Sequence, residues 1–387
     1  MNQVPQLMFT QGMLTDVLSA GAASLFHAGA SDIRIQSDDY VFAYINRRWE
    51  RASDRRLDDG EMRTITSFLY KSMSGLGILG DGVPLDFEVT LQPNRDNPDD
   101  ILRCRANITR SRVGHVGDGI SIVLRTIPTL PIKWEDLNIE PDITENFFPS
   151  QGLVLVIGIT GSGKSTLLSS SIRYRIETLG QPIAIGSYED PVEYVYPRLP
   201  GGRMPEVAQI QLKSHLKEFS LVSPNVLRRK YDVVLIGEMR DRESVETGLL
   251  VSDTGHATYG TLHAETPASA IARIISEFPF DAQPAIATKL LDNTRMIVAQ
   301  KIERTTSGKG LAFRSWCVFD RALKEQLGEH PYPQWSRLIR ERMRLDGSTF
   351  EQRALPALRQ GIIDFDAFMR IAGMNHREAR QFLEANP

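Results

Sequence analysis

The stretch Gly158-Ile159-Thr160-Gly161-Ser162-Gly163-Lys164-Ser165, followed by Thr166, decides the fold of this 387-residue chain. It lies between an apolar run, Leu153 to Ile157, and a helix-like segment from Lys164 to Thr178. Small residues between a strand and a helix let successive backbone N–H groups approach phosphate oxygens, which a Cβ would obstruct. The pattern therefore predicts a phosphate-binding loop in an α/β domain.

The same pattern assigns a role to the side chains at the end of the loop. Lys164 is expected at the β- and γ-phosphates of ATP, the Ser165 hydroxyl at a Mg²⁺ ion, and the helix N-terminus adds positive partial charge. The residues expected to bind the nucleotide are Gly158, Thr160, Gly161, Ser162, Gly163, Lys164, Ser165 and Thr166. The alternative is a glycine-rich turn that binds no ligand.

Composition limits the classes of protein to consider. With 41% hydrophobic and 24% charged residues, the chain is typical of a folded globular protein, and its length predicts two domains and an appendage. The net charge of −3 makes direct nucleic-acid binding unexpected, although a local basic patch stays open. Two cysteines suit a reducing cytoplasm. There is no apolar run near 18 residues and no basic N-terminal flank, so we expect neither a membrane span nor a signal peptide.

The first domain, residues 1–127, is predicted to be a mixed α+β domain. Helices are expected near 12–28 and 58–72 from their apolar spacing. Strands are expected at 31–36, 40–45, 85–91, 102–109 and 120–125. The two prolines of the segment 126–131 favour extended backbone, so a linker is predicted over 128–139.

Arginines recur in this domain. Arg103 and Arg105 alternate on one predicted strand, Arg110 and Arg112 follow it, and Arg125 ends the next strand. They could form a solvated, salt-bridged sheet face. Alternatively, some of them reach the phosphates of a nucleotide, which guanidinium groups bind well.

The second domain, residues 140–318, alternates apolar strands with helices, as in a doubly wound or RecA-like sheet. The predicted strands are 153–157, 183–187, 233–236 and 258–262. Ligands bind beyond the carboxyl ends of such strands, and the polar clusters of this domain follow those ends. Residues 319–387 are predicted to form a helical appendage with arginine-rich faces.

Two of these clusters are acidic. Glu189, Asp190 and Glu193 follow the second strand, where an acidic turn could also be merely solvated. Glu238 follows the third strand, where a Walker B carboxylate would bind the Mg²⁺ shell or orient the attacking water. The preceding residue is Gly237, so the usual Walker B aspartate is missing and Glu238 must serve that role.

Two histidines flank the fourth strand, His256 before it and His263 after it. This spacing, with no cysteine nearby, makes a zinc site improbable. The alternatives left open are structural histidines and sensors of the γ-phosphate.

Together, the stretches GITGSGKST (158–166), SYEDPVEYVY (187–196), VVLIGEMRD (233–241) and TGHATYGTLH (254–263) resemble those of a known family. In order and spacing they are similar to the Walker A, Asp box, Walker B and His box of the secretion ATPases of the PilT/GspE superfamily. Residues 123–128, 227–230 and 360–363 resemble most closely the DotB/TraJ branch of type IVB secretion and conjugation. The resemblance covers most of residues 10–320.

The resemblance implies catalytic roles. Glu193 matches the general base of the Asp box, with Glu189 and Asp190 in support, and Glu238 matches the Walker B glutamate and a Mg²⁺ ligand. His256 and His263 match histidines that sense the nucleotide or bridge to a neighbour. Arg103, Arg112 and Arg125 are three candidates for an arginine that approaches ATP.

The resemblance also implies an architecture and a place in the cell. Members are homohexamers with a PAS-like N-terminal domain and a RecA-like ATPase domain. The implied function is a Mg²⁺-dependent ATP hydrolase that energises type IV secretion or conjugative transfer. It would be cytoplasmic and peripheral at the inner membrane, at the cytoplasmic face of a membrane complex.

Departures from the family keep alternatives open. Pilus-retraction motors carry an Ala-Ile-Arg-Asn-Leu-Ile-Arg-Glu stretch, which only residues 337–341 echo, and a four-cysteine zinc module is missing. The alternatives are a pilus retraction or assembly motor, a nucleic-acid translocase and an ATP-dependent assembly scaffold.

Overall fold

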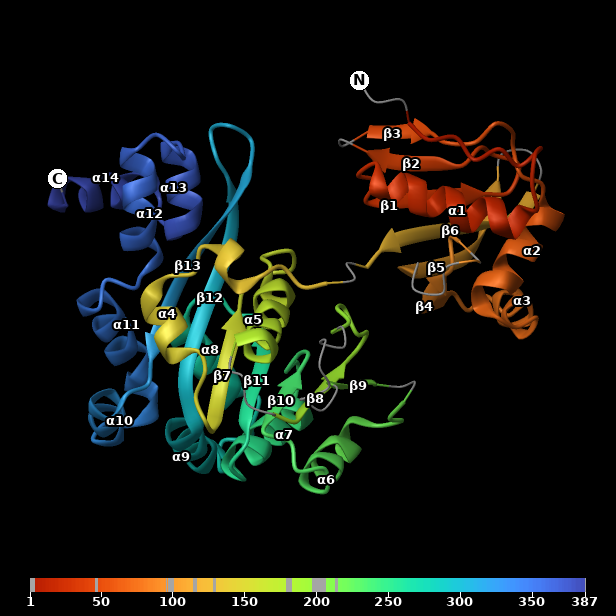
Figure 1. Ribbon diagram of the computed structural model, residues 1–387. Helices are drawn as coiled ribbons and strands as arrows, with labels where there is room; N and C mark the ends of the chain where they lie inside the picture. The colour runs from red at the N-terminus through yellow and green to blue at the C-terminus, as the bar shows by residue number, and fades with distance from the viewer. Residues whose placement is uncertain are drawn as a thin grey trace. The chain divides into compact units, whose positions relative to one another are not determined.

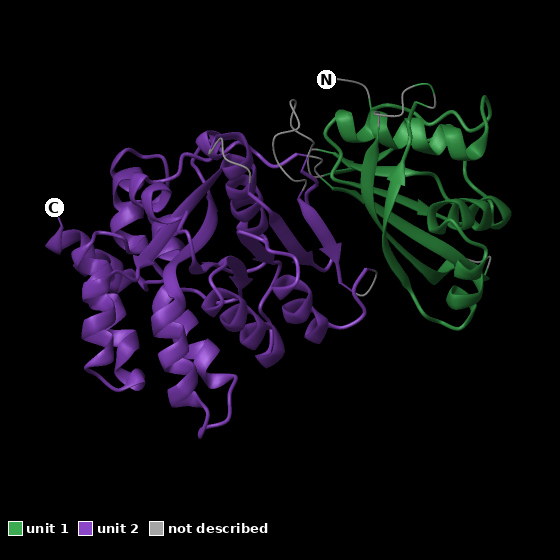
Figure 2. Cartoon of the chain, turned by 60° about the horizontal axis from the view of Figure 1, so that its bottom comes forward, with its two compact units in different colours: residues 1–129 green, residues 130–387 purple. Residues whose placement is uncertain are grey.

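The computed structural model describes residues 4–45, 48–94, 96, 101–113, 117–127, 130–178, 183–196, 207–212 and 215–386. The chain divides into two compact units, residues 1–129 and 130–387 (Figure 2). The division falls inside the predicted linker, whose first two residues lie outside the described part.

Unit 1 is a six-stranded antiparallel sheet with helices, in the strand order β3-β2-β1-β6-β5-β4. Its strands are β1 (Asp32–Gln36), β2 (Phe42–Ile45), β3 (Arg48–Arg51), β4 (Leu85–Leu91), β5 (Leu102–Val113) and β6 (Gly117–Thr126). Its helices are α1 (Leu14–His27), α2 (Asp59–Tyr70) and α3 (Ser74–Gly80). Apolar residues of the helices and of one sheet face share a single core. The fold is α+β, while the closer likeness to a PAS domain stays a prediction.

Unit 2 contains a seven-stranded sheet in the order β13-β12-β7-β11-β10-β8-β9 (Figure 1). All neighbours are parallel except the β12–β13 pair, which is antiparallel. The strands are β7 (Gly152–Ile157), β8 (Ile185–Glu189), β9 (Ala208–Gln211), β10 (Val233–Ile236), β11 (Ala257–Leu262), β12 (Thr294–Arg304) and β13 (Gly310–Val318). The predicted α/β sheet is therefore present.

Helices cover both faces of this sheet. They are α4 (Pro141–Asn146), α5 (Lys164–Thr178), α6 (Val222–Leu227), α7 (Arg242–Asp253), α8 (Pro267–Ser276), α9 (Gln283–Asn293), α10 (Arg321–Gly328), α11 (Trp335–Leu345), α12 (Phe350–Arg359), α13 (Phe365–Ala372) and α14 (His376–Ala385). The described residues of the unit also form short 3₁₀ turns: η1 (Trp134–Leu137), η2 (Phe219–Leu221) and η3 (Tyr332–Gln334).

The central strand β7 shows why both faces are buried. Leu153, Leu155 and Ile157 join one core with α6 to α14, whereas Val154 and Val156 join the other with η1, α4 and α5. Side chains alternate between the two faces of a strand, so a strand between two cores is apolar throughout.

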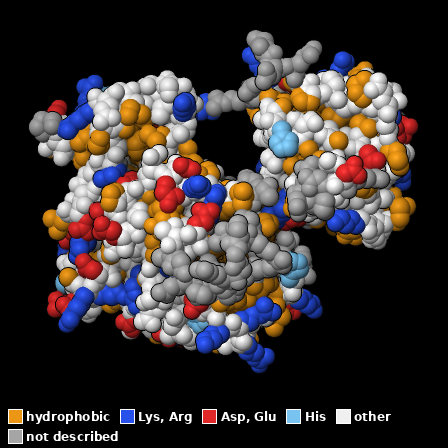
Figure 3. Space-filling view, in the orientation of Figure 1, with side chains coloured by type: hydrophobic (Ala, Val, Ile, Leu, Met, Phe, Trp, Pro, Cys, Tyr) orange, Lys and Arg blue, Asp and Glu red, His pale blue; other side chains and the backbone are white. Residues whose placement is uncertain are grey.

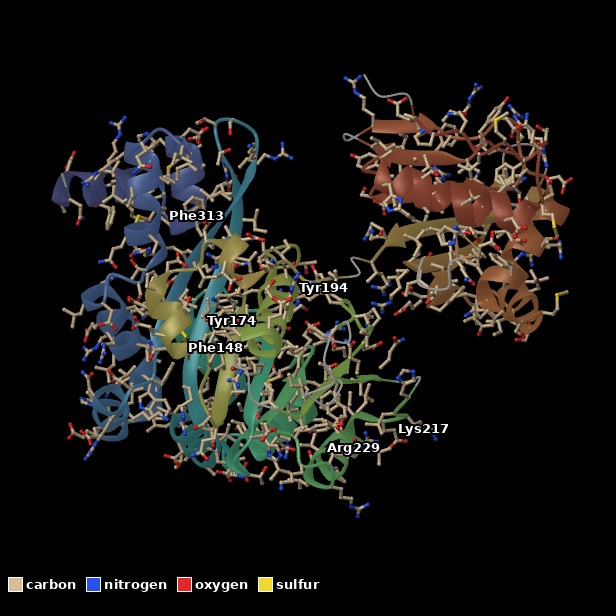
Figure 4. All side chains as sticks on the ribbon, in the orientation of Figure 1. Phe148, Tyr174, Tyr194, Lys217, Arg229 and Phe313 are labelled. Carbon is tan, nitrogen blue, oxygen red and sulfur yellow. The ribbon has the colours of Figure 1, made fainter. Side chains whose placement is uncertain are left out.

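The segments on either side of the predicted ATPase domain belong to the same unit. The helices after residue 319 share the larger core, so the predicted helical appendage packs within unit 2. The predicted linker is folded from Leu130 onward, because Trp134 is buried against Phe147 and Tyr174, with ring centroids 5.2 and 6.0 Å away. Figure 4 labels Tyr174 beside Phe148, on which it stacks at 5.1 Å.

Candidate functional site

The predicted phosphate-binding loop leads from β7 into α5, and its backbone has the conformation that its glycines allow. Gly161 and Gly163 have φ values of 80° and 83°, which L side chains rarely adopt. A Cβ on Gly163 would lie 2.7 Å from Nε2 of Gln300. Thr160 and Gly161 are exposed at the tip, whereas Ser162 is buried and its hydroxyl has no hydrogen-bond partner among the described residues. The loop fits a phosphate cradle in shape and in available donors.

Lys164 lies at this loop and near two of the predicted acids. Its Nζ donates to the carbonyl oxygens of Gly158 and Ile159, at 2.9 and 3.0 Å. Burial lowers the pKa of Lys164, and the charges of Glu238 and Glu193 oppose that shift. The cation is thus held where an anionic oxygen could replace neutral carbonyls.

Glu238 connects the Walker B stretch to the His box. Its Oε1 lies 2.9 Å from Nε2 of His263, and its Oε2 lies 2.6 Å from a guanidinium nitrogen of Arg240. The contact follows from the sheet, because β10 and β11 are parallel neighbours and both residues follow their carboxyl ends. The sequence did not single out Arg240.

The absence of a Walker B aspartate has a steric explanation. A Cβ at Gly237 would lie 3.2 Å from Cα and 3.3 Å from Cγ of Glu189. An aspartate there would press against the end of β8 and add a second carboxylate beside Glu189.

Glu189 and Glu193 stand in different environments. Glu189 ends β8 and is buried, and its Oε1 has no hydrogen-bond partner among the described residues. Burial raises the pKa of Glu189 to about 7. Glu193 and Asp190 are exposed. Glu193 and Asp190 are therefore the acids of this turn that can meet water.

Tyr194 ties this turn to the phosphate-binding loop. Its hydroxyl lies 3.0 Å from Oγ1 of Thr166, and its carbonyl oxygen accepts a hydrogen bond of 2.6 Å from Gln209 (Figure 4). The Thr166 hydroxyl thus contacts a protein group, whereas the Ser165 hydroxyl has no hydrogen-bond partner within the described part of the chain. The sequence singled out Thr166 but not Tyr194, because no local pattern pairs them.

His256 lies at the other edge of the sheet. It precedes β11, and Ala257 pairs with Gly152 while Leu262 pairs with Ile157. Six residues of strand separate it from the phosphate loop by about 20 Å. Its Nδ1 lies 3.1 Å from both Oγ1 of Thr254 and the carbonyl oxygen of Val251. The structure therefore brings only His263 to the predicted site, and a bridging role for His256 stays a prediction.

The three candidate arginines lie in unit 1 and differ in their contacts. Arg103 is 5% exposed and donates to both carboxylate oxygens of Glu88, at 2.7 and 2.6 Å. Arg125 pairs with Asp32 at 2.7 Å. Arg112 is exposed, and no described residue forms an ion pair with it. Arg112 is therefore the one of the three whose guanidinium could bind an anion without first breaking an ion pair with a described carboxylate.

The donor set fits a magnesium ion better than a metal held by the protein alone. No group of three or more His, Cys, Asp or Glu side chains within the described ranges could hold a metal ion. Mg²⁺ takes most of its ligands from water and phosphate and needs only one or two protein oxygens. Ser165 and Glu238 can supply these.

Glu189 gives a prediction about stability. Its carboxyl binds a proton in the folded chain up to pH 7 but releases it near pH 4.5 when unfolded, so folding stability falls as the pH rises through this window. Glu189→Gln removes the effect. Between pH 5 and pH 8 the wild type should lose roughly 2–3 kcal/mol relative to this variant in chemical denaturation. The exposed Glu193→Gln is the control, and parallel stability profiles for the wild type and Glu189→Gln would contradict the assignment.

Comparison with known proteins identifies the family. The family described as type II/IV secretion system protein matches residues 10–329. The chain is 32% identical to a twitching motility protein of Neisseria gonorrhoeae over 270 residues, 69% of this chain and 70% of that protein. The crystal structure of the Legionella pneumophila ATPase DotB superposes with a TM-score of 0.80 at 31% identity, covering 91% of this chain and 94% of that one. The pilus retraction motor PilT with bound ADP also gives 0.80, at 25% identity, over 95% and 99% of the two chains. The chain therefore belongs to the type II/IV secretion system proteins and, within them, to the PilT/GspE superfamily with a DotB-like structure.

Proposed function

We propose that this chain is a Mg²⁺-dependent ATP hydrolase that works as a homohexameric motor of a type IVB-like secretion or conjugative transfer system. The observation that carries the choice of system is the likeness to DotB, at 31% identity over 91% of this chain. The motor would act at the cytoplasmic face of a membrane complex, peripheral to the inner membrane. None of the described helices has the length and apolar character needed to cross a bilayer, so the attachment would be through partners.

The residues of unit 2 divide the work of hydrolysis. Lys164 and the loop N–H groups bind the phosphates, and Ser165 and Glu238 bind the ion, which neutralises phosphate charge. Both oxygens of Glu238 already have cationic or imidazole partners, whereas no described residue forms a hydrogen bond or ion pair with the side chain of Glu193. Glu193 is therefore the better candidate to orient water as the general base, with Glu189 and His263 in support.

The first test of this proposal is steady-state hydrolysis of Mg²⁺-ATP. Lys164→Ala and Glu238→Gln should each lower kcat/KM by about 10²-fold or more, because each removes a charge aligned with the phosphates. Lys324→Ala is a matched control: this lysine is also half-buried with a lowered pKa, and its Nζ donates to the carbonyl of Asp292 at the opposite edge of the sheet. Undiminished turnover in both site variants would refute ATP hydrolysis at this loop.

The second test concerns the arginine. We expect Arg112→Ala to lower kcat by about 10²-fold, as loss of a cation that stabilises the transferring phosphoryl group does. Arg110→Ala is the control, because Arg110 lies on the same face of β5 two residues earlier and pairs with Asp118. A full rate for Arg112→Ala with a loss for Arg103→Ala or Arg125→Ala would move the role to that arginine.

A pilus-retraction motor is the second candidate, and the 32% identity to the Neisseria twitching motility protein favours it. Residues 337–341, which echo the retraction stretch, lie in α11, where Leu338 and Ile339 are buried and Arg337 pairs with Glu341 at 3.6 Å. These residues therefore serve the packing of α11 and an ion pair within the helix, and these contacts do not by themselves indicate retraction.

Deletion of the gene separates the two systems. A type IVB motor predicts loss of protein or DNA transfer with unchanged pili, and complementation by wild type but not by Glu238→Gln. Excess surface pili with normal transfer would instead assign the chain to retraction. Complementation by Glu238→Gln would favour an assembly scaffold whose turnover is incidental.

A nucleic-acid translocase is the less favoured alternative. On the face shown in Figure 3, Lys and Arg side chains of unit 2 are interspersed with Asp and Glu side chains. A strand-binding groove would need a continuous basic surface with aromatic side chains. Salt-dependent binding of single-stranded DNA would revive this alternative.

A further inference from the structure

A buried arginine on β13 is linked to the phosphate-binding loop in space, although the two are far apart in the sequence. Arg314 on β13 is 2% exposed, next to Phe313, which Figure 4 labels on the same strand. Its Nε donates to Oε1 of Gln300 at 2.8 Å. A buried guanidinium is costly unless its N–H groups have partners, so the identity of those partners is informative.

Gln300 contacts both Arg314 and the phosphate-binding loop. The side chain is buried, and its Nε2 donates to the carbonyl oxygen of Ser162 at 2.7 Å. Arg314 can only donate, so the amide oxygen must face it and the NH₂ group must face Ser162. Arg314 thereby fixes the orientation in which Gln300 holds the loop.

The backbone packs equally closely at this point. β12 lies beside β7, with Ala299 paired to Ile157, so Gln300 is level with the start of the loop. A Cβ on Gly158 would lie 2.5 Å from the carbonyl oxygen of Gln300. The loop therefore has little room to shift unless Gln300 shifts with it.

The other guanidinium nitrogens of Arg314 reach the segment that opens unit 2. They donate to the carbonyl oxygens of Leu137 and Asn138, at 3.1 and 3.2 Å, and to Oε2 of Glu140 at 3.2 Å. Asn138 adopts a left-handed conformation with φ 47° and so turns the chain between η1 and α4. These residues come soon after the chain leaves unit 1 at residue 129.

We propose that Gln300 and Arg314 are positioning residues that couple the phosphate-binding loop to residues 137–140. Nucleotide binding at the loop and the placement of this segment then depend on each other through two buried side chains. The proposal rests on the proposed function for its ligand, ATP, and goes beyond it by naming the path along which unit 2 passes nucleotide occupancy to the segment that follows unit 1.

Two substitutions of Gln300 separate this role from simple core packing. Gln300→Met keeps the length but removes both hydrogen bonds, and Gln300→Glu keeps an acceptor for Arg314 but cannot donate to Ser162. Leaving a buried carbonyl without its donor costs about 1–3 kcal/mol, so both variants should raise KM for ATP about tenfold with a much smaller change in kcat. If KM for ATP rises in Gln300→Glu but not in Gln300→Met, the added negative charge explains the rise and the proposal is overturned.

Ser348→Ala is the matched control for stability. Ser348 is buried, and its hydroxyl donates to the carbonyl of Trp316 on the same strand as Arg314 at 2.6 Å. Its loss should lower the unfolding midpoint without changing KM. If Ser348→Ala raises KM as much as Gln300→Met does, the effect is general destabilisation and the proposal fails.

The coupling itself is measured in a double-variant cycle with Glu140→Ala. Alone, Glu140→Ala should raise KM about threefold, as loss of one partner of a network does. Combined with Gln300→Met it should add little, because the path is already broken. If KM of the double variant rises by the product of the two single-variant factors, Glu140 and Gln300 act independently, and the proposed coupling is overturned.

Hydrogen exchange gives a readout that does not depend on turnover. ATP should slow amide exchange over residues 131–140 in the wild-type chain and leave it unchanged in Gln300→Met. A wild type that does not hydrolyse ATP would refute the proposed function, whereas a wild type that hydrolyses it and shows the same ATP-dependent protection as Gln300→Met would refute only this inference.

Discussion

The parallel arrangement of β7, β8, β10 and β11 is the constraint on which the site depends. Parallel strands point their carboxyl ends at one edge, so the four loops that follow them meet there although the chain runs from Ile157 at the end of β7 to Leu262 at the end of β11. The contact of 2.9 Å between Oε1 of Glu238 and Nε2 of His263 is the direct result. If one of these strands ran in the opposite direction, the loop that follows it would lie at the other edge of the sheet, away from the site.

The same edge collects more negative than positive charge. The charges of Glu193 and Glu238 both act on Lys164, whereas burial raises the pKa of Glu189 to about 7. Arg240 and His263 are already engaged with Glu238. In the proposed function a divalent cation would offset this charge when a polyphosphate binds, and the carboxylate that follows β10 would help to hold that cation.

Sequence reasoning succeeded where a pattern repeats locally. β7 and β10 were predictable because both of their faces are buried, so their residues are apolar without interruption. The loop was predictable because its glycines are required by backbone geometry. β9 and β12 were missed because Gln209, Gln211 and the polar end of β12 interrupt the apolar runs, and β13 was missed with its hairpin partner. Tyr194, Gln300 and Arg314 gave no signal because their partners are distant in sequence.

The two supports of the phosphate-binding loop show what the sequence left out. Tyr194 holds Thr166 on the side of the acidic turn, and Gln300 holds Ser162 on the side of β12. These contacts leave the Ser165 hydroxyl and the exposed tip of the loop without protein partners among the described residues. The loop is therefore held by side chains where it meets the protein and is open at its tip.

The charge available at the site sets a further condition. Among the described residues of unit 2, Lys164 is a cation at this site that would exchange only hydrogen bonds to neutral carbonyl oxygens for contacts with an anion. A transition state that spreads charge over several phosphate oxygens is stabilised by more than one cation, which is the physical reason why the proposed function includes an arginine.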